Sequence, residues 1–377
     1  MNIEAIKSKL SCAAPRHNFN DGGKSKPGFI LISTFLMLTV ALLAVTRMYY
    51  KGSMYNLFIP VVVQRDQAKR LALSGVHIAI AQLSLHDSQL IPLKSEGNKD
   101  ELEKQQKPEQ RRKDLLKTML HVLNNRQVFL LEESKDGLDG EIGICITSED
   151  GKIPLQALID YKKREFIKTD KLDGTEILKF VSEKLKTIAS DVDFIECFTR
   201  YIKNMPEQMT DIGQLLTIKE FKPFARSFFY EPLFNQEGQE EKKTIYLADL
   251  FTIWNQSATI DPLVLSPSVR FILGCEYPSG KTDIESEQIQ MVAEKFPFSY
   301  ASWQKDWDTY LKPIYKQEYK TIAPAFLPLL SGKFEPRVFS VLSYGKIGRI
   351  KQKLLAIIER SFTDAGEVFA VKRLYWL

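Results

Sequence analysis

The sequence predicts an α+β protein in which one long N-terminal helix is joined to a small antiparallel sheet with large helical insertions. Two observations predict this class. An uncharged apolar run near the N-terminus passes into a stretch with the periodicity of an amphipathic helix. Short β-rich segments then stand on both sides of a long middle region with helical spacing, so we expect helical insertions to divide the sheet in the sequence.

The composition is that of an ordinary globular protein. Hydrophobic residues make up 44% and charged residues 26% of the 377 residues, which is enough for about two or three domains with a buried core. The 52 Lys and Arg residues are interspersed with 47 Asp and Glu residues, for a net charge of +5. This balance does not by itself indicate nucleic-acid binding, although a basic face stays possible because net charge does not locate the charges.

The N-terminal apolar run is long enough to cross a membrane. Phe29 to Thr46 contains no charged residue, and a helix of this length spans about 27 Å. The preceding segment is basic, with more Lys and Arg than Asp and Glu. The positive-inside rule therefore keeps that end in the cytoplasm and predicts that the chain after the helix is exported.

The residues that flank this run help to distinguish a cleaved signal peptide from other N-terminal membrane segments. A secretory signal peptide needs a small-x-small cleavage site after its apolar part, and Arg47 to Lys51 offer none. Instead, Gly28 stands directly before Phe29. This arrangement resembles a type IV prepilin, and an uncleaved anchor is the alternative. The resemblance implies cleavage between Gly28 and Phe29 by prepilin peptidase, followed by N-methylation of Phe29.

The apolar pattern continues beyond the membrane segment. Leu73, Val76, Ile80 and Leu83 recur at helical spacing. We therefore expect one helix from the membrane segment to about residue 86. We expect Gly52 and Pro60 to be points where the helix is weaker or bends, because glycine is flexible and proline removes a helical hydrogen bond.

Four segments, in order, resemble the K-type minor pseudopilins of type II secretion, the general secretion pathway protein K family. They are Ala68 to Leu83, Ile142 to Gln156, Leu250 to Trp254 with Ala258 to Val269, and Phe334 to Leu377. The resemblance implies a pilin-like fold with helical, SAM-like insertions. It also implies a non-enzymatic role at the tip of a pseudopilus, in its assembly and in protein secretion across the outer membrane.

The family resemblance implies partners and a location. The partners would be the I-type and J-type minor pseudopilins, the major pseudopilin and prepilin peptidase. The location would be the bacterial inner membrane, crossed once, with the C-terminal head in the periplasm. Packing of the membrane helix would use Phe29, Ile30, Leu31, Ile32, Ser33, Phe35, Leu36 and Leu38. Ser33 stands where most pilins have Glu, and a subunit at the tip has no neighbour above it to pair with that charge.

The sequence departs from the family at several positions. Pro154, Gln156, Asp261 and Leu263 stand where the family has Asn or an Asn-containing run. No acidic cluster for calcium is evident, and the segment 170–176 lacks the alternating ligands of an EF-hand loop. We therefore expect no cofactor, and structural calcium is possible but unsupported.

The resemblance and the local patterns together suggest seven segments. They are a prepilin leader (1–28), the transmembrane and amphipathic helix (29–86), a charged linker (87–126), pilin-core strands (127–160), a first helical insert (161–248), a second helical segment (249–332) and C-terminal strands (333–377). The linker could instead be a binding patch, but its mixed charges favour a solvated segment.

Within these segments, particular elements are predicted. Residues 127–132 and 141–147 should form a hairpin, and 175–229 should be helical, with Thr210 and Asp211 as a possible cap. A second helical stretch should run from about Pro267 to Leu330, with Trp303 and Trp307 as a packing pair. Gly366 should introduce the last strand.

Catalytic signatures are missing from the sequence. All four histidines lie in the first third of the chain, and there is no Walker A, GxGxxG or HExxH motif. No CxxC pair occurs, and Cys145, Cys197 and Cys275 permit at most one disulfide or three buried thiols. Two other functions stay open: a minor pilin of an adhesion or DNA-uptake pilus, and a membrane-anchored nucleic-acid-binding module.

Overall fold

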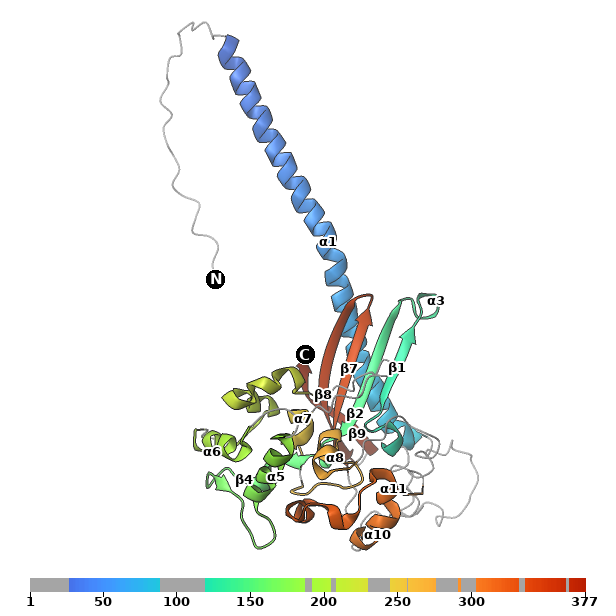
Figure 1. Cartoon of the computed structure of the whole chain (residues 1–377). Coiled ribbons are helices and arrows are strands. Elements are labelled where there is room, and N and C mark those ends of the chain that lie inside the picture. Colours follow the sequence, from blue (N-terminus) through green and yellow to red (C-terminus); the bar gives the residue numbers. More distant parts are fainter. Residues whose placement is uncertain are drawn as a thin grey trace, which may run out of the picture. The chain divides into compact units, whose positions relative to one another are not determined.

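The computed structural model describes residues 27–88, 119–186, 192–204, 208–229, 245–255, 257–275, 291–292, 303–331, 336–363 and 366–377. Helix α1 (Pro27–Ser88) is its longest element (Figure 1). The chain divides into two compact units, residues 1–61 and residues 62–377, which we call the head. Cys12 and most of the predicted linker lie outside the described residues.

The head is built on one five-stranded antiparallel sheet with the order β1-β2-β7-β8-β9 (Figure 1). Its strands are β1 (Arg126–Leu131), β2 (Gly140–Ser148), β7 (Val338–Ile347), β8 (Ile350–Thr363) and β9 (Gly366–Trp376). The predicted first hairpin and last strand are confirmed. The long helix and this sheet together give the pilin-like α+β class that the sequence predicts.

The second half of α1 packs on this sheet through small residues. Ala68, Ala72 and Ala79 are fully buried, and a Cβ atom added to Gly345 of β7 would stand 2.1 Å from the Ala68 carbonyl oxygen. Helix and strand therefore approach more closely than larger side chains would permit. The sequence periodicity identified Val76 and Leu83 correctly. It also predicted that Leu73 and Ile80 are buried, but both are only half-buried, because the alanines form the centre of the contact.

Between β2 and β7 the chain forms short helices and two small sheets. The α-helices and 3₁₀ helices are α4 (Leu155–Leu158), α5 (Gly174–Lys186), α6 (Phe194–Asn204), η3 (Ile212–Thr217), η4 (Lys219–Ser227), α7 (Leu247–Leu250), α8 (Pro267–Leu273), α10 (Trp303–Tyr310), α11 (Lys312–Tyr315), η5 (Tyr319–Thr321) and η6 (Pro324–Leu329). The short strands are β3 (Ile153–Pro154) with β6 (Phe251–Thr252), and β4 (Ile159–Asp160) with β5 (Glu165–Phe166). Two further short elements are α3 (Glu133–Asp136), which lies between β1 and β2, and η2 (Glu149–Gly151), which follows β2.

The two predicted helical stretches are each divided into separate helices. The stretch 175–229 is helical as predicted, and its end is formed by the 3₁₀ helices η3 and η4, which contain Gly213 and Pro223. Asp211 does cap η3, since its side chain accepts a hydrogen bond from the Gly213 amide at 2.7 Å. The stretch from Pro267 is not continuous either: α8 ends at Gly274, whose φ of 77° is left-handed.

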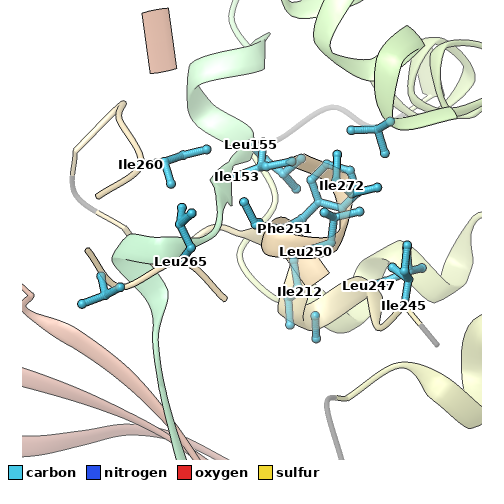
Figure 2. Packing of buried hydrophobic residues seen from close by; sticks show 14 of the residues in the cluster. Ile153, Leu155, Ile212, Ile245, Leu247, Leu250, Phe251, Ile260, Leu265 and Ile272 are labelled. Carbon is cyan, nitrogen blue, oxygen red and sulfur yellow. The ribbon is translucent and has the colours of Figure 1, made fainter. Parts of the chain in front are cut away.

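Aromatic and aliphatic side chains fill the interior of the insertions. Phe194 and Phe198 of α6 pack against Phe221 and Phe251, with ring centroids 5.0 to 5.9 Å apart. Figure 2 shows Phe251 among aliphatic side chains from several elements, including Ile153, Leu250 and Ile272. The predicted pair Trp303 and Trp307 is also confirmed, at 6.0 Å. The insertions therefore share one core with the sheet.

Candidate functional site

The first candidate site is the exposed half of α1. From Leu31 to Val63 most large apolar side chains of this helix are more than half exposed, and residues 31–46 carry no charge. Apolar side chains cover all sides of this helix, which is typical of a helix that is surrounded by lipid or by other helices. Among the described residues, one helix is long and apolar enough to cross a membrane, and it is α1.

Three threonine side chains in this half are satisfied within the helix. The hydroxyl groups of Thr34, Thr39 and Thr46 donate to the carbonyl oxygens of Leu31, Leu36 and Leu42, at 2.9, 2.8 and 2.7 Å. An unsatisfied hydroxyl would be costly in hydrocarbon. The segment therefore presents no unpaired threonine donor to a surrounding apolar medium.

The structure places the predicted site residues at the start of this helix. Gly28 and Phe29 lie in the first turn of α1, where backbone amides lack helical partners and the helix frays most easily. The side chains of 27–30, including Ile30, lie outside the described residues. Leu31, Ile32, Phe35, Leu36 and Leu38 are 61 to 73% exposed, and Ser33 is exposed among them. Cleavage, methylation and helix packing at these residues stay predictions.

The apolar exposure extends well past Arg47 and Lys51. Met54, Phe58, Ile59 and Val61 are 40 to 57% exposed. A bilayer core needs only about 20 helical residues. The exposed apolar helix is thus longer than one membrane crossing requires, and its second part is available for contacts with protein.

The second candidate site lies in the head, where two segments that resemble the K-type family meet. Ile153 pairs in parallel with Phe251, the Asp261 amide donates to the Asp150 carbonyl at 2.8 Å, and the Ser266 amide donates to the Gly151 carbonyl at 3.1 Å. The sequence placed these segments about a hundred residues apart and gave no sign of their contact. We call this meeting point the joint.

A buried ion pair ties the joint to the sheet. The Lys152 ammonium pairs with the Glu149 carboxylate and donates to the Ala248 carbonyl at 2.9 Å and the Ser340 hydroxyl at 3.2 Å. Glu149 also accepts hydrogen bonds from the hydroxyls of Ser340 and Thr252. Both charged side chains are only 3% exposed. This saturated network connects the sheet with the insertions, which is a structural role.

Three further carboxyl groups lie at the joint. Burial raises the pKa of Asp150 to about 6, against the lowering effect of the Arg337 and Val338 amides that donate to it. Burial also raises the pKa of Asp249 and of Asp261, both fully buried. The Asp249 Oδ1 and Asp261 Oδ2 atoms have no hydrogen-bond partner among the described residues. Burial therefore favours the protonated form of these three carboxyl groups, whereas the Glu149 carboxylate is paired with Lys152.

A cavity of about 20 Å³ adjoins the joint. Its lining includes Cys145, Lys152, Asp249, Trp254 and Ser340. This volume is about that of a single water molecule, so the cavity is too small for an organic substrate.

The three cysteines behave as buried thiols. Cys145, Cys197 and Cys275 are unbonded in the structure, and burial raises the pKa of their thiols to about 12, 11 and 12. Protonated, buried thiols are poor nucleophiles. Of the two possibilities that the sequence left open, the structure has buried thiols.

The loop before α5 is a helix cap. The Asp173 carboxylate accepts from the Thr175 amide and hydroxyl at 2.9 and 2.6 Å and pairs with Lys168 at 3.0 Å. The Thr175 hydrogen bonds lower the pKa of Asp173 to about 2. No three His, Cys, Asp or Glu side chains of the described part of the chain gather in a way that could hold a metal ion.

Comparison with known proteins finds similarity among solved structures but none in sequence. No family model matches the chain, and no curated protein matches it in sequence. Among solved structures, the chain is similar to one in the GspK-GspI-GspJ complex of the type 2 secretion system of enterotoxigenic Escherichia coli. The alignment has 13% sequence identity and a TM-score of 0.36, and covers 70% of this chain and 92% of that chain.

Proposed function

We propose that this chain is a minor pseudopilin of the K type, which acts at the tip of a type II secretion pseudopilus. One observation carries the proposal. A single helix changes from an exposed, uncharged apolar half to a half whose alanines are buried on a five-stranded antiparallel sheet. One half is suited to lipid and helix bundles, and the other half is part of a folded head.

In this proposal the helix acts twice. It first anchors the chain in the bacterial inner membrane, with the head in the periplasm, and then packs against the helices of neighbouring subunits. Prepilin peptidase would cut between Gly28 and Phe29, and Phe29 would be methylated. Residues 29–38 and the following apolar residues would form the packing surface with the I-type, J-type and major pseudopilins.

The tip position is supported by Ser33. A carboxylate in the membrane helix is favourable only if a neighbouring subunit supplies a positive partner. The hydroxyl of Ser33 carries no charge and needs no such neighbour. A subunit with the large inserted head described above is also suited to end a fibre, since such a head adds bulk where no further subunit follows. No residue in this proposal has a catalytic role.

The test is the mature N-terminus of the chain from native cells. We expect mass spectrometry to find Phe29 first and methylated, and Gly28→Leu to block both processing and secretion. Gly52→Leu is the matched control, because Gly52 lies in the same helix with nothing within 4 Å of an added Cβ atom. A chain that still begins at Met1, or normal secretion with an unprocessed Gly28→Leu chain, would contradict the proposal.

A further inference from the structure

The two edges of the sheet differ in how well they are protected against an added strand. At the β9 edge a register irregularity lies between Ile357 and Ile358, and Lys372 of β9 pairs with Glu359. Bulges and charges at an edge oppose strand addition. At the other edge, β1 pairs with β2 in a continuous register, and residues 127–131 contain no charge and no proline. The β1 edge is therefore the one that can accept a strand.

The β1 edge also exposes apolar side chains on one face. Val128 and Leu130 are 41% and 76% exposed. Val128 lies opposite Gly143 of β2, and directly opposed residues share a face. The neighbouring Ile142 points towards α1, since a Cβ atom added to Gly75 would stand 3.0 Å from it. Because side chains alternate along a strand, Val128 and Leu130 lie on the face away from α1.

Charges of opposite sign stand at the two ends of this apolar pair. Arg126 begins β1, and its guanidinium lies 3.8 Å from the Glu141 carboxylate. Glu132 follows β1 with an extended backbone, φ −114° and ψ 131°, so the alternation of faces continues to this residue. The Glu132 side chain pairs with Lys135 and is still 61% exposed. We define the β1 row as the residues that share this face, in order basic, apolar, apolar and acidic: Arg126, Val128, Leu130 and Glu132.

The β1 row determines the chemistry of a complementary strand. In an antiparallel pair the partner meets the row in reverse order. From its own N-terminus, such a partner has a basic residue, two apolar residues and an acidic residue at alternate positions. The turn after β1 favours the basic residue further, because Glu133, Asp136 and Asp139 lie there with Lys135 as the single basic residue.

A second copy of this chain has the same pattern in β1, but the direction of α1 in the head argues against it. There α1 runs antiparallel to β7, because Gly75 lies against Ser343 and Ala68 lies against Gly345. β1 has the direction of β7, since both strands pair antiparallel with β2. Two β1 strands paired antiparallel would therefore receive their α1 segments from opposite ends of the joined sheet. Two copies held by one membrane enter it from the same side, so we expect a partner of another sequence.

We propose that the open edge of β1 binds an extended segment of another protein, paired antiparallel with β1. The segment presents apolar side chains to Val128 and Leu130 and a basic side chain to Glu132. Backbone hydrogen bonds along the edge supply affinity, and the β1 row supplies sequence preference. This inference goes beyond the proposed function and does not depend on it, because it uses the head alone.

The test is binding of synthetic peptides to the detergent-solubilised full-length chain. The probe reads Lys-Thr-Val-Thr-Val-Thr-Glu, and the matched control is the reversed peptide, Glu-Thr-Val-Thr-Val-Thr-Lys, which has the same composition. We expect the probe to bind about threefold more tightly or better, and to slow hydrogen exchange of the β1 amides. No saturable binding, equal binding of the two peptides, or slowed exchange at β9 instead of β1 would overturn the inference.

Variants of the β1 row provide a second measurement. We expect Leu130→Lys to weaken binding of the probe by about fivefold or more. Val368→Lys is the matched control on the opposite edge strand, where Val368 is 43% exposed, and it should leave binding unchanged. Glu132→Lys should abolish the preference between the two peptides, since each then has one favourable and one unfavourable charge pair. Equal losses for the Leu130 and Val368 variants, or a preference that survives Glu132→Lys, would overturn the inference.

Discussion

The exposed half of α1 and the joint of the head handle polar groups in opposite ways. In the helix, Thr34 and Thr39 donate to carbonyl groups only three residues away. In the joint, Lys152 reaches Ala248 and Ser340, which are 96 and 188 residues away. The threonines of the helix are satisfied without any tertiary structure, whereas the Lys152–Glu149 network of the joint forms only when distant segments of the head are folded together.

This difference shows which perturbation each region can tolerate. The helix is suited to a medium without water, so an added charge should disrupt it and a lost tertiary contact should not. The joint already contains buried charge, so the loss of one partner should disrupt it most. The following predictions test the two regions separately.

The largest effect should come from Lys152→Met. This variant leaves the buried Glu149 carboxylate without its cation, which we expect to lower the free energy of unfolding by about 3–5 kcal/mol. Denaturant unfolding of the full chain in detergent, followed by tryptophan fluorescence, measures it. The control is the double variant Glu149→Gln/Lys152→Met, which should recover most of the loss because no unpaired charge remains. A single variant as stable as the parent would show that the network contributes little.

A charge in the exposed helix should have the next largest effect. Leu36→Lys places an ammonium group near the centre of the uncharged run, at a cost of about 3 kcal/mol for membrane insertion. We expect less of this chain in carbonate-washed membranes. Phe58→Lys is the control, since Phe58 is similarly exposed on α1 but lies beyond the predicted span. Equal losses for both variants would mean that the span is misplaced.

The sequence predicted these two regions unequally, for a physical reason. The apolar helix and the start of the last strand follow from local patterns, since Phe29 to Thr46 is uncharged and Gly366 opens a strand. The joint depends on contacts between distant segments. The residues next to Glu149 and Thr252 in the sequence do not predict the hydrogen bond between these two side chains. The alanine contact of α1 was missed because alanine has a weak hydrophobic signal, although it lets the backbones approach.

Close packing in the second half of α1 predicts a smaller effect. Gly345→Ala brings a Cβ atom to 2.1 Å from the Ala68 carbonyl oxygen and 2.8 Å from the Ala72 amide nitrogen. Backbone atoms must move, so we expect a loss of about 2–3 kcal/mol in the free energy of unfolding. Gly52→Ala makes the same change in the exposed half with open space around it. It should leave the head unaffected, and an unfolding midpoint shifted equally by both changes would contradict this account.

The smallest effect is a dependence on pH that arises at the joint. Burial raises the pKa of Asp150 from 3.8 to about 6, so between these values the folded chain binds a proton that the unfolded chain has released. The free energy of unfolding must therefore fall as the pH rises through this interval. From about pH 4.5 to about pH 6.5 the expected fall is on the order of 2 kcal/mol. Asp249 and Asp261, whose pKa values are also raised, act in the same direction.

Carboxyl groups with a lowered pKa act in a different interval. Hydrogen bonds from Tyr344 and from Thr175 lower the pKa of Glu141 and of Asp173, so their contribution is complete above about pH 4.5 and is lost only in stronger acid. The head should thus be most stable in mild acid. Thermal unfolding across this range measures the effect. Asp150→Asn should remove the part of the fall that Asp150 contributes, since the amide oxygen still accepts from the Arg337 amide and residue 150 no longer titrates. Any fall that remains in this variant is assigned to Asp249 and Asp261. A parent chain that gains stability from pH 4.5 to 6.5 would mean that the buried carboxyl groups of the joint are ionised, and the contrast with the uncharged helix would then be sharper than we infer.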